Sequence, residues 1–367
     1  TLIVDANDRS FAAVRTQEAS VAASAGRPMM QQERVDDSHP NRWEEPGAYK
    51  VVPGVLRLPL PVPDRGLRAV NVYVVEGDDG LTLIDAGWAY PPGRTALGDA
   101  LAELSYSVQD IRSVLVTHVH MDHYSQGATL RRESGCRLAI GEGERPSLEA
   151  MHSGVERENQ TQIAELRRHG AWPVIEALKA GGYDGPTDAD LWELPDEWIR
   201  NGQLFEVGKT TLRAMHTPGH TQGHLVYVDD DRGLLFSGDH VLPHITPSIG
   251  YESRVGALAL NSYLSSLRAV RKLPDMMMLP AHGPVWSSVH SRVEELLAHH
   301  EQRLDACAAL LDGRPRTAYE VAQGLPWTKR GRRFADLNPL NQMLAVCETA
   351  AHLDVLELHG RCVREEA

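Results

Sequence analysis

The sequence contains few cysteines, and no two of them stand close together. Its 367 residues include only Cys136, Cys307, Cys347 and Cys362, with no C-x-x-C pair. This spacing argues against a disulfide framework and against a zinc site built from thiolates. We therefore expect reduced cysteines that serve mainly in packing.

Long apolar runs are also absent. No stretch approaches the roughly 18 apolar residues that a transmembrane helix requires. The N-terminus carries Asp5, Asp8, Arg9 and Arg15, and it has no apolar segment of signal-peptide length. The sequence therefore predicts a cytoplasmic protein that does not bind membranes.

Basic residues are scarce relative to acidic ones. Lys and Arg number 37 against 50 Asp and Glu, which gives a formal net charge of -13 at pH 7. Because an acidic surface repels phosphate backbones, we expect no nucleic-acid partner unless a local basic patch exists. The length allows about two domains with a full hydrophobic core.

The most informative stretch is residues 117–123, T-H-V-H-M-D-H, which directly follow an apolar run typical of a buried strand. Residues two apart in an extended segment point to the same side, so His118 and His120 can face one ion. After a turn, Asp122 and His123 can face a second ion. Imidazole nitrogen and carboxylate oxygen suit zinc and related divalent metals.

Three later segments place further ligand-type side chains at strand ends. A tight Pro-Gly turn presents His220 in the motif T-P-G-H-T-Q-G-H. Asp239 follows a glycine in F-S-G-D-H, and His282 stands in L-P-A-H-G. Each segment alone is a weak signal, but together they form an ordered set of strand-ending loops.

This order resembles the metallo-β-lactamase superfamily, over about residues 51–286. The C-terminal helices resemble the tail of its lactamase-like-2 branch, which is related to glyoxalase II. The resemblance implies a site for two divalent ions, with zinc expected and iron or manganese as alternatives. The first ion takes His118, His120 and His220, the second takes Asp122, His123 and His282, and Asp239 bridges both.

Four further positions lie near this predicted site. Asp85 matches an acidic residue of the family that orients a metal ligand, and His224 matches a position that is usually structural. His240 and His244 stand one and five positions beyond Asp239. Either can protonate a leaving group or contact the substrate, and the alternative is an ordinary loop histidine.

Several departures from the family pattern narrow the substrate. Lactamases of the commonest type have a cysteine at the position of Asp239, so hydrolysis of antibiotics is not expected. Lactonases that act on acyl-homoserine lactones have a tyrosine at the position of Leu242, and flavodiiron relatives have a glutamate at that of His120. The basic residues that hold glutathione in glyoxalase II have no evident equivalent, and the long insertion of RNA-processing nucleases is missing.

The fold class that we predict is an α/β protein, an αββα sandwich of two sheets covered by helices. Residues 48–288 form this catalytic domain, and residues 142–200 are a helical insertion within it. The insertion is either a lid beside the site or a set of helices packed on the scaffold. Residues 1–47 are a flexible or subunit-contacting extension, and residues 289–367 form a winged-helix-like domain.

The pattern of apolar residues places the expected elements along the chain. Strands are predicted at 51–60, 69–75, 81–84, 114–116, 137–140, 204–207, 210–215, 225–228, 234–236, 276–279 and 361–364. Helices are predicted at 95–105, 125–132, 147–180, 255–272, 289–311, 318–323 and 337–356.

The chemistry that we predict is hydrolysis with two metal ions. Paired ions lower the pKa of a shared water from about 15.7 towards neutrality. The resulting metal-bridging hydroxide would attack an activated small molecule, namely an ester, thioester, lactone or activated ether. Asp122 and Asp239 would then act in catalysis as well as in metal binding.

Two other functions are compatible with the same residues. One is a persulfide dioxygenase-like oxidoreductase with a single iron ion, and metal analysis separates it from the hydrolase. The other is a nuclease or nucleic-acid-binding protein that uses residues 289–367, for which salt-sensitive binding is the test. We also expect oligomers that form through residues 1–47 or 289–367.

Overall fold

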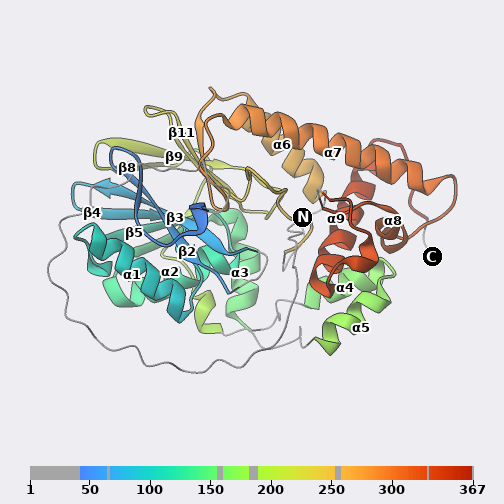
Figure 1. Cartoon of the computed structure of the whole chain (residues 1–367), viewed down its shortest axis with the longest axis horizontal. Helices are drawn as coiled ribbons and strands as arrows, with labels where there is room; N and C mark the ends of the chain where they lie inside the picture. Colours follow the sequence, from blue (N-terminus) through green and yellow to red (C-terminus); the bar gives the residue numbers. More distant parts are fainter. Residues whose placement is uncertain are drawn as a thin grey trace.

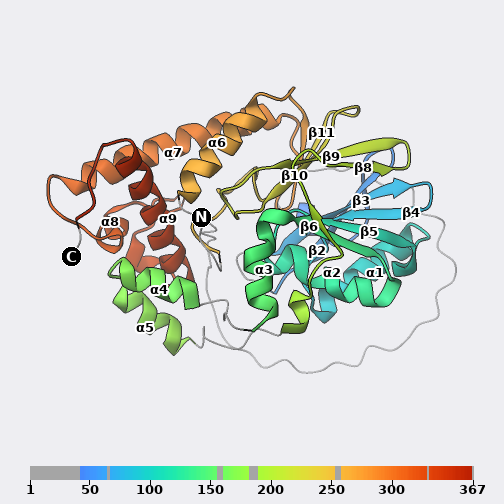
Figure 2. The same cartoon turned by 180° about the vertical axis from the view of Figure 1, so that it is seen from behind.

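The computed structural model describes residues 42–63, 67–154, 160–181, 189–252, 258–328 and 330–365. Two β-sheets lie face to face, and helices cover the outer face of each (Figure 1, and from behind in Figure 2). This arrangement confirms the predicted αββα sandwich.

Within the described residues, the first sheet has seven strands in sequence order. They are β1 (Tyr49–Val52), β2 (Val55–Pro61), β3 (Ala69–Gly77), β4 (Gly80–Ile84), β5 (Ile111–Val116), β6 (Arg137–Gly141) and β7 (Glu197–Ile199). Neighbours from β1 to β4 are antiparallel, whereas β4 to β7 are parallel. The single strand predicted at 51–60 is two strands, because Pro53 and Gly54 form a turn within it.

The second sheet has the order β12-β11-β10-β9-β8, and only its β11–β12 pair is parallel. Its strands are β8 (Leu204–Val207), β9 (Thr210–His216), β10 (Leu225–Asp229), β11 (Leu234–Gly238) and β12 (Met277–Pro280). All five strands predicted in this part of the chain are confirmed.

Side chains alternate between two apolar layers along the central strands. In β3, Val72 and Val74 pack beneath the outer helices, while Tyr73 and Val75 face the second sheet. This alternation follows from the two-residue period of an extended chain. Tyr227 and Phe236 fill the space between the sheets from the other side.

The helices α1 (Pro91–Glu103), α2 (Met121–Ser134) and α3 (Arg145–His152) lie on the outer face of the first sheet. We expected the second of them to begin at Ser125. It begins four residues earlier, with His120 as its N-cap, so Asp122 and His123 belong to its first turn.

The remaining helices lie beside the second sheet (Figure 2). They are α4 (Gln160–Arg168), α5 (Trp172–Ala180), α6 (Ala259–Arg271), α7 (Val289–Leu311), α8 (Ala318–Gly324) and α9 (Pro339–Leu358). Helices α6 and α7 lead to a group formed by α4, α5, α8 and α9. Helices α4 and α5 of the insertion pack against α9, so three separate helices replace the predicted segment 147–180. Residues 155–159 and 182–188 of the insertion lie outside the described residues.

Two predictions at the chain ends need revision. Residues 361–364 form no strand, so the predicted wing is wrong and the winged-helix assignment is not confirmed. Trp43 is buried, and its carbonyl accepts a hydrogen bond of 3.2 Å from Arg57 Nη1 in β2. Packing against the sheet therefore starts before the predicted boundary at residue 48. Most of the predicted extension, residues 1–41, lies outside the described residues.

None of the helices in the described ranges has the length and apolar character needed to cross a membrane.

Candidate metal centre

Ligand-type side chains converge at one edge of the two sheets. Each follows a strand: Asp85 follows β4, His118 and His120 follow β5, Asp239 follows β11, and His282 follows β12. The strands β4 and β5 are parallel neighbours, as are β11 and β12, so each pair ends at the same edge. The site therefore brings together segments that lie far apart in the sequence.

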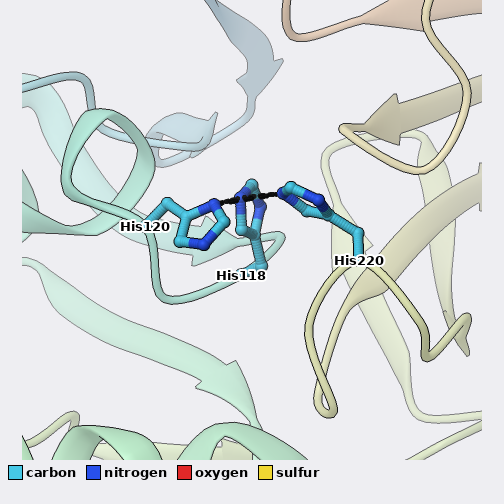
Figure 3. A group of neighbouring side chains, drawn as sticks. All are labelled: His118, His120 and His220. Atoms are coloured by element: carbon cyan, nitrogen blue, oxygen red, sulfur yellow. Dashed lines mark hydrogen bonds between the residues drawn. The ribbon is translucent and has the colours of Figure 1, made fainter. Parts of the chain in front are cut away.

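Three histidines form the first group. His118 and His120 come from the loop after β5, and His220 comes from the loop between β9 and β10 (Figure 3). His118 Nε2 lies 2.9 Å from His120 Nδ1, and His220 Nε2 lies 3.2 and 3.1 Å from these two atoms. Imidazole nitrogens bound tetrahedrally to zinc at about 2.0–2.1 Å are separated by about 3.4 Å, close to this triangle.

The far nitrogens of two of these rings are held by backbone carbonyls. His220 Nδ1 donates to the Ser248 carbonyl at 2.8 Å, and His120 Nε2 lies 3.4 Å from the Tyr251 carbonyl. A neutral imidazole that donates through one nitrogen presents the other as a bare acceptor. Burial lowers the pKa of both histidines, so their inner nitrogens are available to a metal at neutral pH.

His118 is oriented through a threonine. The Thr117 hydroxyl donates to the Asp85 carboxylate at 2.9 Å, which leaves its oxygen to accept from His118 Nδ1 at 3.0 Å. Burial, with the neighbouring histidines, holds the pKa of His118 well below its usual value. His118 Nε2 is therefore bare and points into the three-histidine group.

Asp122, His123 and His282 form the second group. His282 Nε2 lies 3.3 Å from Asp122 Oδ2, and His123 Nε2 lies 3.7 Å from Asp122 Oδ1. The outer nitrogens are fixed, since His123 Nδ1 bonds to Asp85 Oδ2 and His282 Nδ1 to the Ala69 carbonyl, each at 2.8 Å. Among the described residues, the buried Nε2 atoms of both histidines have no hydrogen-bond partner.

The carboxylate of Asp239 contacts both groups. Its Oδ2 lies 3.5 Å from His220 Nε2 in the first group. Its Oδ1 lies 3.5 Å from His282 Nε2 and 3.7 Å from His123 Nε2 in the second. Oδ1 is buried without a hydrogen-bond partner in the described part of the chain. Asp239 thus lies between the two groups, with one carboxylate oxygen towards each.

The charges at the second group favour a bound cation. Burial alone lowers the pKa of His123, but the carboxylates of Asp85, Asp122 and Asp239 outweigh it and raise that pKa to about 10. Burial likewise raises the pKa of Asp122, yet His123 and His282 bring it below its usual value. Buried imidazole nitrogens and carboxylate oxygens that have no hydrogen-bond partner are the ligand atoms that a divalent metal ion requires.

Asp85 supports the second group from behind. Its Oδ1 accepts the Thr117 backbone N–H at 2.8 Å, while Oδ2 accepts from His123. Its φ angle of 64° lies in the left-handed region, which aspartate and asparagine tolerate better than most residues. Asp85 therefore contacts a ligand as the sequence led us to expect.

His224 holds the backbone of the bridging residue. Its Nε2 accepts the Asp239 N–H at 3.2 Å, and its Nδ1 lies 3.0 Å from the Thr217 hydroxyl. A Cβ on Gly238 would lie 2.8 Å from His224 Nε2, so only glycine permits this contact without rearrangement. These contacts hold the Asp239 backbone and the Thr217 side chain in place.

His240 and His244 lie outside the three clusters of ligand-type side chains found among the described residues. His240 is fully buried with its ring 5.3 Å from that of Tyr263, and burial lowers its pKa to about 3. A histidine that is neutral at neutral pH is a poor general acid, so this placement does not favour the proton-donating role that we considered for it. His244 is exposed, with its ring 5.8 Å from that of Trp286.

Sequence reasoning missed three buried residues around the site. Asn71 of β3 donates through Nδ2 to the carbonyls of Pro280 and Gly283, at 2.9 and 2.8 Å, on both sides of His282. Glu144 and Glu252 are buried against the loop that follows His220. A carboxylate or amide that bonds to a loop far away in the sequence produces no local sequence pattern. These three residues could therefore not be identified from the sequence.

Comparison with known proteins agrees with this geometry. The family model described as the metallo-beta-lactamase superfamily matches residues 65–282, more than half of the chain. A crystal structure of a metallo-beta-lactamase family protein from Thermus thermophilus is 29% identical with a TM-score of 0.70, covering 85% of this chain and 95% of that one. A beta-lactamase domain protein from Burkholderia ambifaria is 26% identical with a TM-score of 0.69, covering 87% and 92%.

Curated relatives include bacterial and fungal proteins. The Bacillus subtilis protein named "Probable metallo-hydrolase YqjP" is 28% identical over 307 residues, which are 82% of this chain and 91% of that protein. An Aspergillus fumigatus protein named "Atrochrysone carboxyl ACP thioesterase" is 24% identical over 249 residues, which are 66% of this chain and 44% of that protein. The chain therefore belongs to the metallo-beta-lactamase superfamily and is a metal-dependent hydrolase.

Proposed function

We propose that this protein hydrolyses an activated acyl compound with two divalent metal ions, held at the three-histidine group and at the Asp122, His123 and His282 group. The observation that carries the proposal is the placement of Asp239. Its two carboxylate oxygens face different groups, at 3.5 Å from His220 and 3.5 Å from His282. A single-ion site does not require a carboxylate that is shared in this way.

The side chains themselves bind the ions and orient the reacting water. When bound, two divalent ions supply a water of lowered pKa and polarise the bond that is attacked. Asp122 is an acceptor only when ionised, so it can orient the attacking water by accepting its hydrogen. The neighbouring histidines keep the Asp122 pKa below its usual value, which maintains this ionised form at neutral pH.

Metal-activated water needs no protein nucleophile, and the buried cysteines of the described residues are poorly suited to that role. Cys136, Cys307 and Cys347 are buried, and burial raises the pKa of each thiol, to about 12 for Cys307 and Cys347. A thiol with such a pKa forms little thiolate at neutral pH. Water is therefore the nucleophile that the site can best supply.

Among activated acyl compounds, we favour a thioester. Two relatives carry thioesterase names, although this chain spans less than half of the length of each. Asp239, in the place of the cysteine of the commonest lactamases, argues against antibiotics. Esters, lactones and activated ethers are the other members of the substrate class and serve as comparison compounds.

The proposal is tested by metal analysis and turnover of the full-length protein. We expect two zinc-like ions per chain, and release of thiol from an acyl thioester that is lost on chelation and regained when zinc is added. Asp239→Asn should lose most turnover, whereas Asp230→Asn, at an exposed residue just after β10, should retain it. One iron ion per chain with oxygen uptake would instead identify a dioxygenase, and turnover without metal would refute the proposal.

A further inference from the structure

Glu144 connects the start of the insertion to the loops that carry the three histidines. It ends the 3-10 turn Glu142–Glu144 after β6, and its side chain is fully buried. Its Oε1 accepts a hydrogen bond from the Thr221 hydroxyl, and the backbone N–H groups of Val119 and Gly223 interact with the carboxyl group electrostatically. Val119 stands between His118 and His120, and Thr221 directly follows His220.

The partners of Glu144 thus come from both loops of the three-histidine group. Val119 lies in the loop after β5, while Thr221 and Gly223 lie in the loop between β9 and β10. A buried carboxyl group that interacts with the N–H and O–H groups of two loops favours one separation between those loops. That separation sets the distance between His220 and the other two ligands.

The fit between these segments excludes any side chain at Gly223. A Cβ there would lie 2.1 Å from the Glu144 backbone nitrogen, far closer than atoms can approach. The glycine of the T-P-G-H-T-x-G-H motif is therefore required by the approach of Glu144, and the threonine of the motif supplies a hydroxyl to it. Contact with Glu144 thus explains why the motif has Thr221 and Gly223, neither of which binds a metal.

A second carboxylate lies against the same loop. Glu252 is buried and accepts the backbone N–H of Gln222, so residues 221–223 contact both Glu144 and Glu252. Glu252 ends a segment whose Ser248 and Tyr251 carbonyls contact the outer nitrogens of His220 and His120. Its own carbonyl accepts a hydrogen bond of 2.9 Å from Gln162 of α4.

We propose that Glu144 is a positioning residue for the three-histidine half of the metal centre, and that it makes metal affinity in that half depend on the insertion. The inference rests on the two-metal function proposed above. The other half has different supports, namely Asp85 behind His123, and Ala69 and Asn71 behind His282. Loss of Glu144 should therefore weaken one ion and leave the other unchanged.

The experiment titrates metal-free, full-length protein with Co²⁺ and follows the visible absorption of each bound ion. Glu144→Ala should weaken one of two bound ions by about 10-fold to 100-fold, the range found when a group that orients a ligand is lost. Glu144→Gln should recover much of this loss, because its amide oxygen can still accept from Thr221 while its NH₂ group takes the place of Oε2, which has no hydrogen-bond partner among the described residues. Glu142→Gln, at an exposed residue two positions away, should match the wild type.

A double-mutant comparison assigns the weakened ion to one half of the site. In a His220→Ala background, Glu144→Ala should produce no further loss of Co²⁺ affinity. In a His282→Ala background, its effect on the remaining ion should persist. If Glu144→Ala does not fold, Thr221→Val removes one donor at nearly constant size and should weaken the same ion.

The two proposals fail in different ways. A wild-type protein that binds fewer than two Co²⁺ ions refutes the two-metal function, whatever Glu144 does. A wild-type protein that binds two ions, with unchanged affinities in Glu144→Ala and Thr221→Val, refutes the positioning role alone. Equal weakening of both ions would also contradict it, because Glu144 would then support the whole fold.

Discussion

Replacing Asp85 with asparagine should separate the electrostatic support of His123 from its packing. Asp85 Oδ2 accepts from His123 Nδ1 at 2.8 Å, and Oδ1 accepts the Thr117 N–H at the same distance. Asparagine has nearly the same shape and tolerates the φ of 64° at this position. The backbone can therefore stay as it is while the charge is removed.

The expected effect follows from the tautomer of His123. If the new amide oxygen accepts from Thr117, its NH₂ group faces His123 Nδ1, and two donors then oppose each other. The ring relieves this conflict by moving its proton to Nε2, the atom that faces Asp122 and Asp239. We expect metal binding at the second group to weaken by 10-fold to 100-fold, or about 1.4–2.7 kcal/mol.

Calorimetric titration of metal-free protein with zinc measures this change directly. The weakened ion should differ from the one that Glu144→Ala weakens, because the asparagine oxygen still accepts from Thr117 and so keeps the support of His118. Asp99→Asn, at an exposed position of α1, is the matched control. Unchanged zinc affinities in a folded Asp85→Asn protein would refute the role assigned to this carboxylate.

Further predictions concern the fold around the centre. Asn71→Ala removes two buried hydrogen bonds to the loop of His282, so the free energy of unfolding in urea should fall by about 2 kcal/mol; an unchanged value would show that the loop is held otherwise. His352, buried between α7 and α9 beside His300, has its pKa lowered to about 4 by burial, below the unfolded value of about 6.5. The unfolded chain therefore takes up a proton first as the pH falls. The contribution of neutral His352 to the free energy of unfolding is therefore full above pH 6.5 and is lost towards pH 4, at about 1.4 kcal/mol per pH unit. His352→Gln should reduce the slope of the free energy of unfolding against pH by that amount. An equal slope in the variant would contradict the lowered pKa of His352.

The ligands were predictable because each follows a strand that the apolar pattern marks clearly. His118, His120, Asp239 and His282 could be assigned to strand-ending loops from that pattern, and the family resemblance then grouped them, since β5 belongs to one sheet and β11 and β12 to the other. The αββα layers follow from the same pattern, since the buried strands alternate with amphipathic helices. Local sequence thus contains most of what places the metal-binding loops.

Long-range contacts explain what sequence reasoning could not supply. Glu144 and Asn71 act on loops distant in sequence, so neither shows a local pattern that marks it. His240 stands beside a ligand in sequence, but its ring turns to Tyr263 in the apolar layer around α6. Residues 361–364 lie against α9, where Arg364 bonds to Asp354, and they pair with none of the described strands.

The bridging role of Asp239 is the central claim, and anomalous X-ray diffraction from zinc-loaded crystals tests it most directly. We predict two peaks at the zinc absorption edge, one within bonding distance of the three histidines and one beside Asp122, His123 and His282. Each oxygen of Asp239 should contact a different peak. A single peak, or two peaks with Asp239 bound to only one of them, would contradict the account.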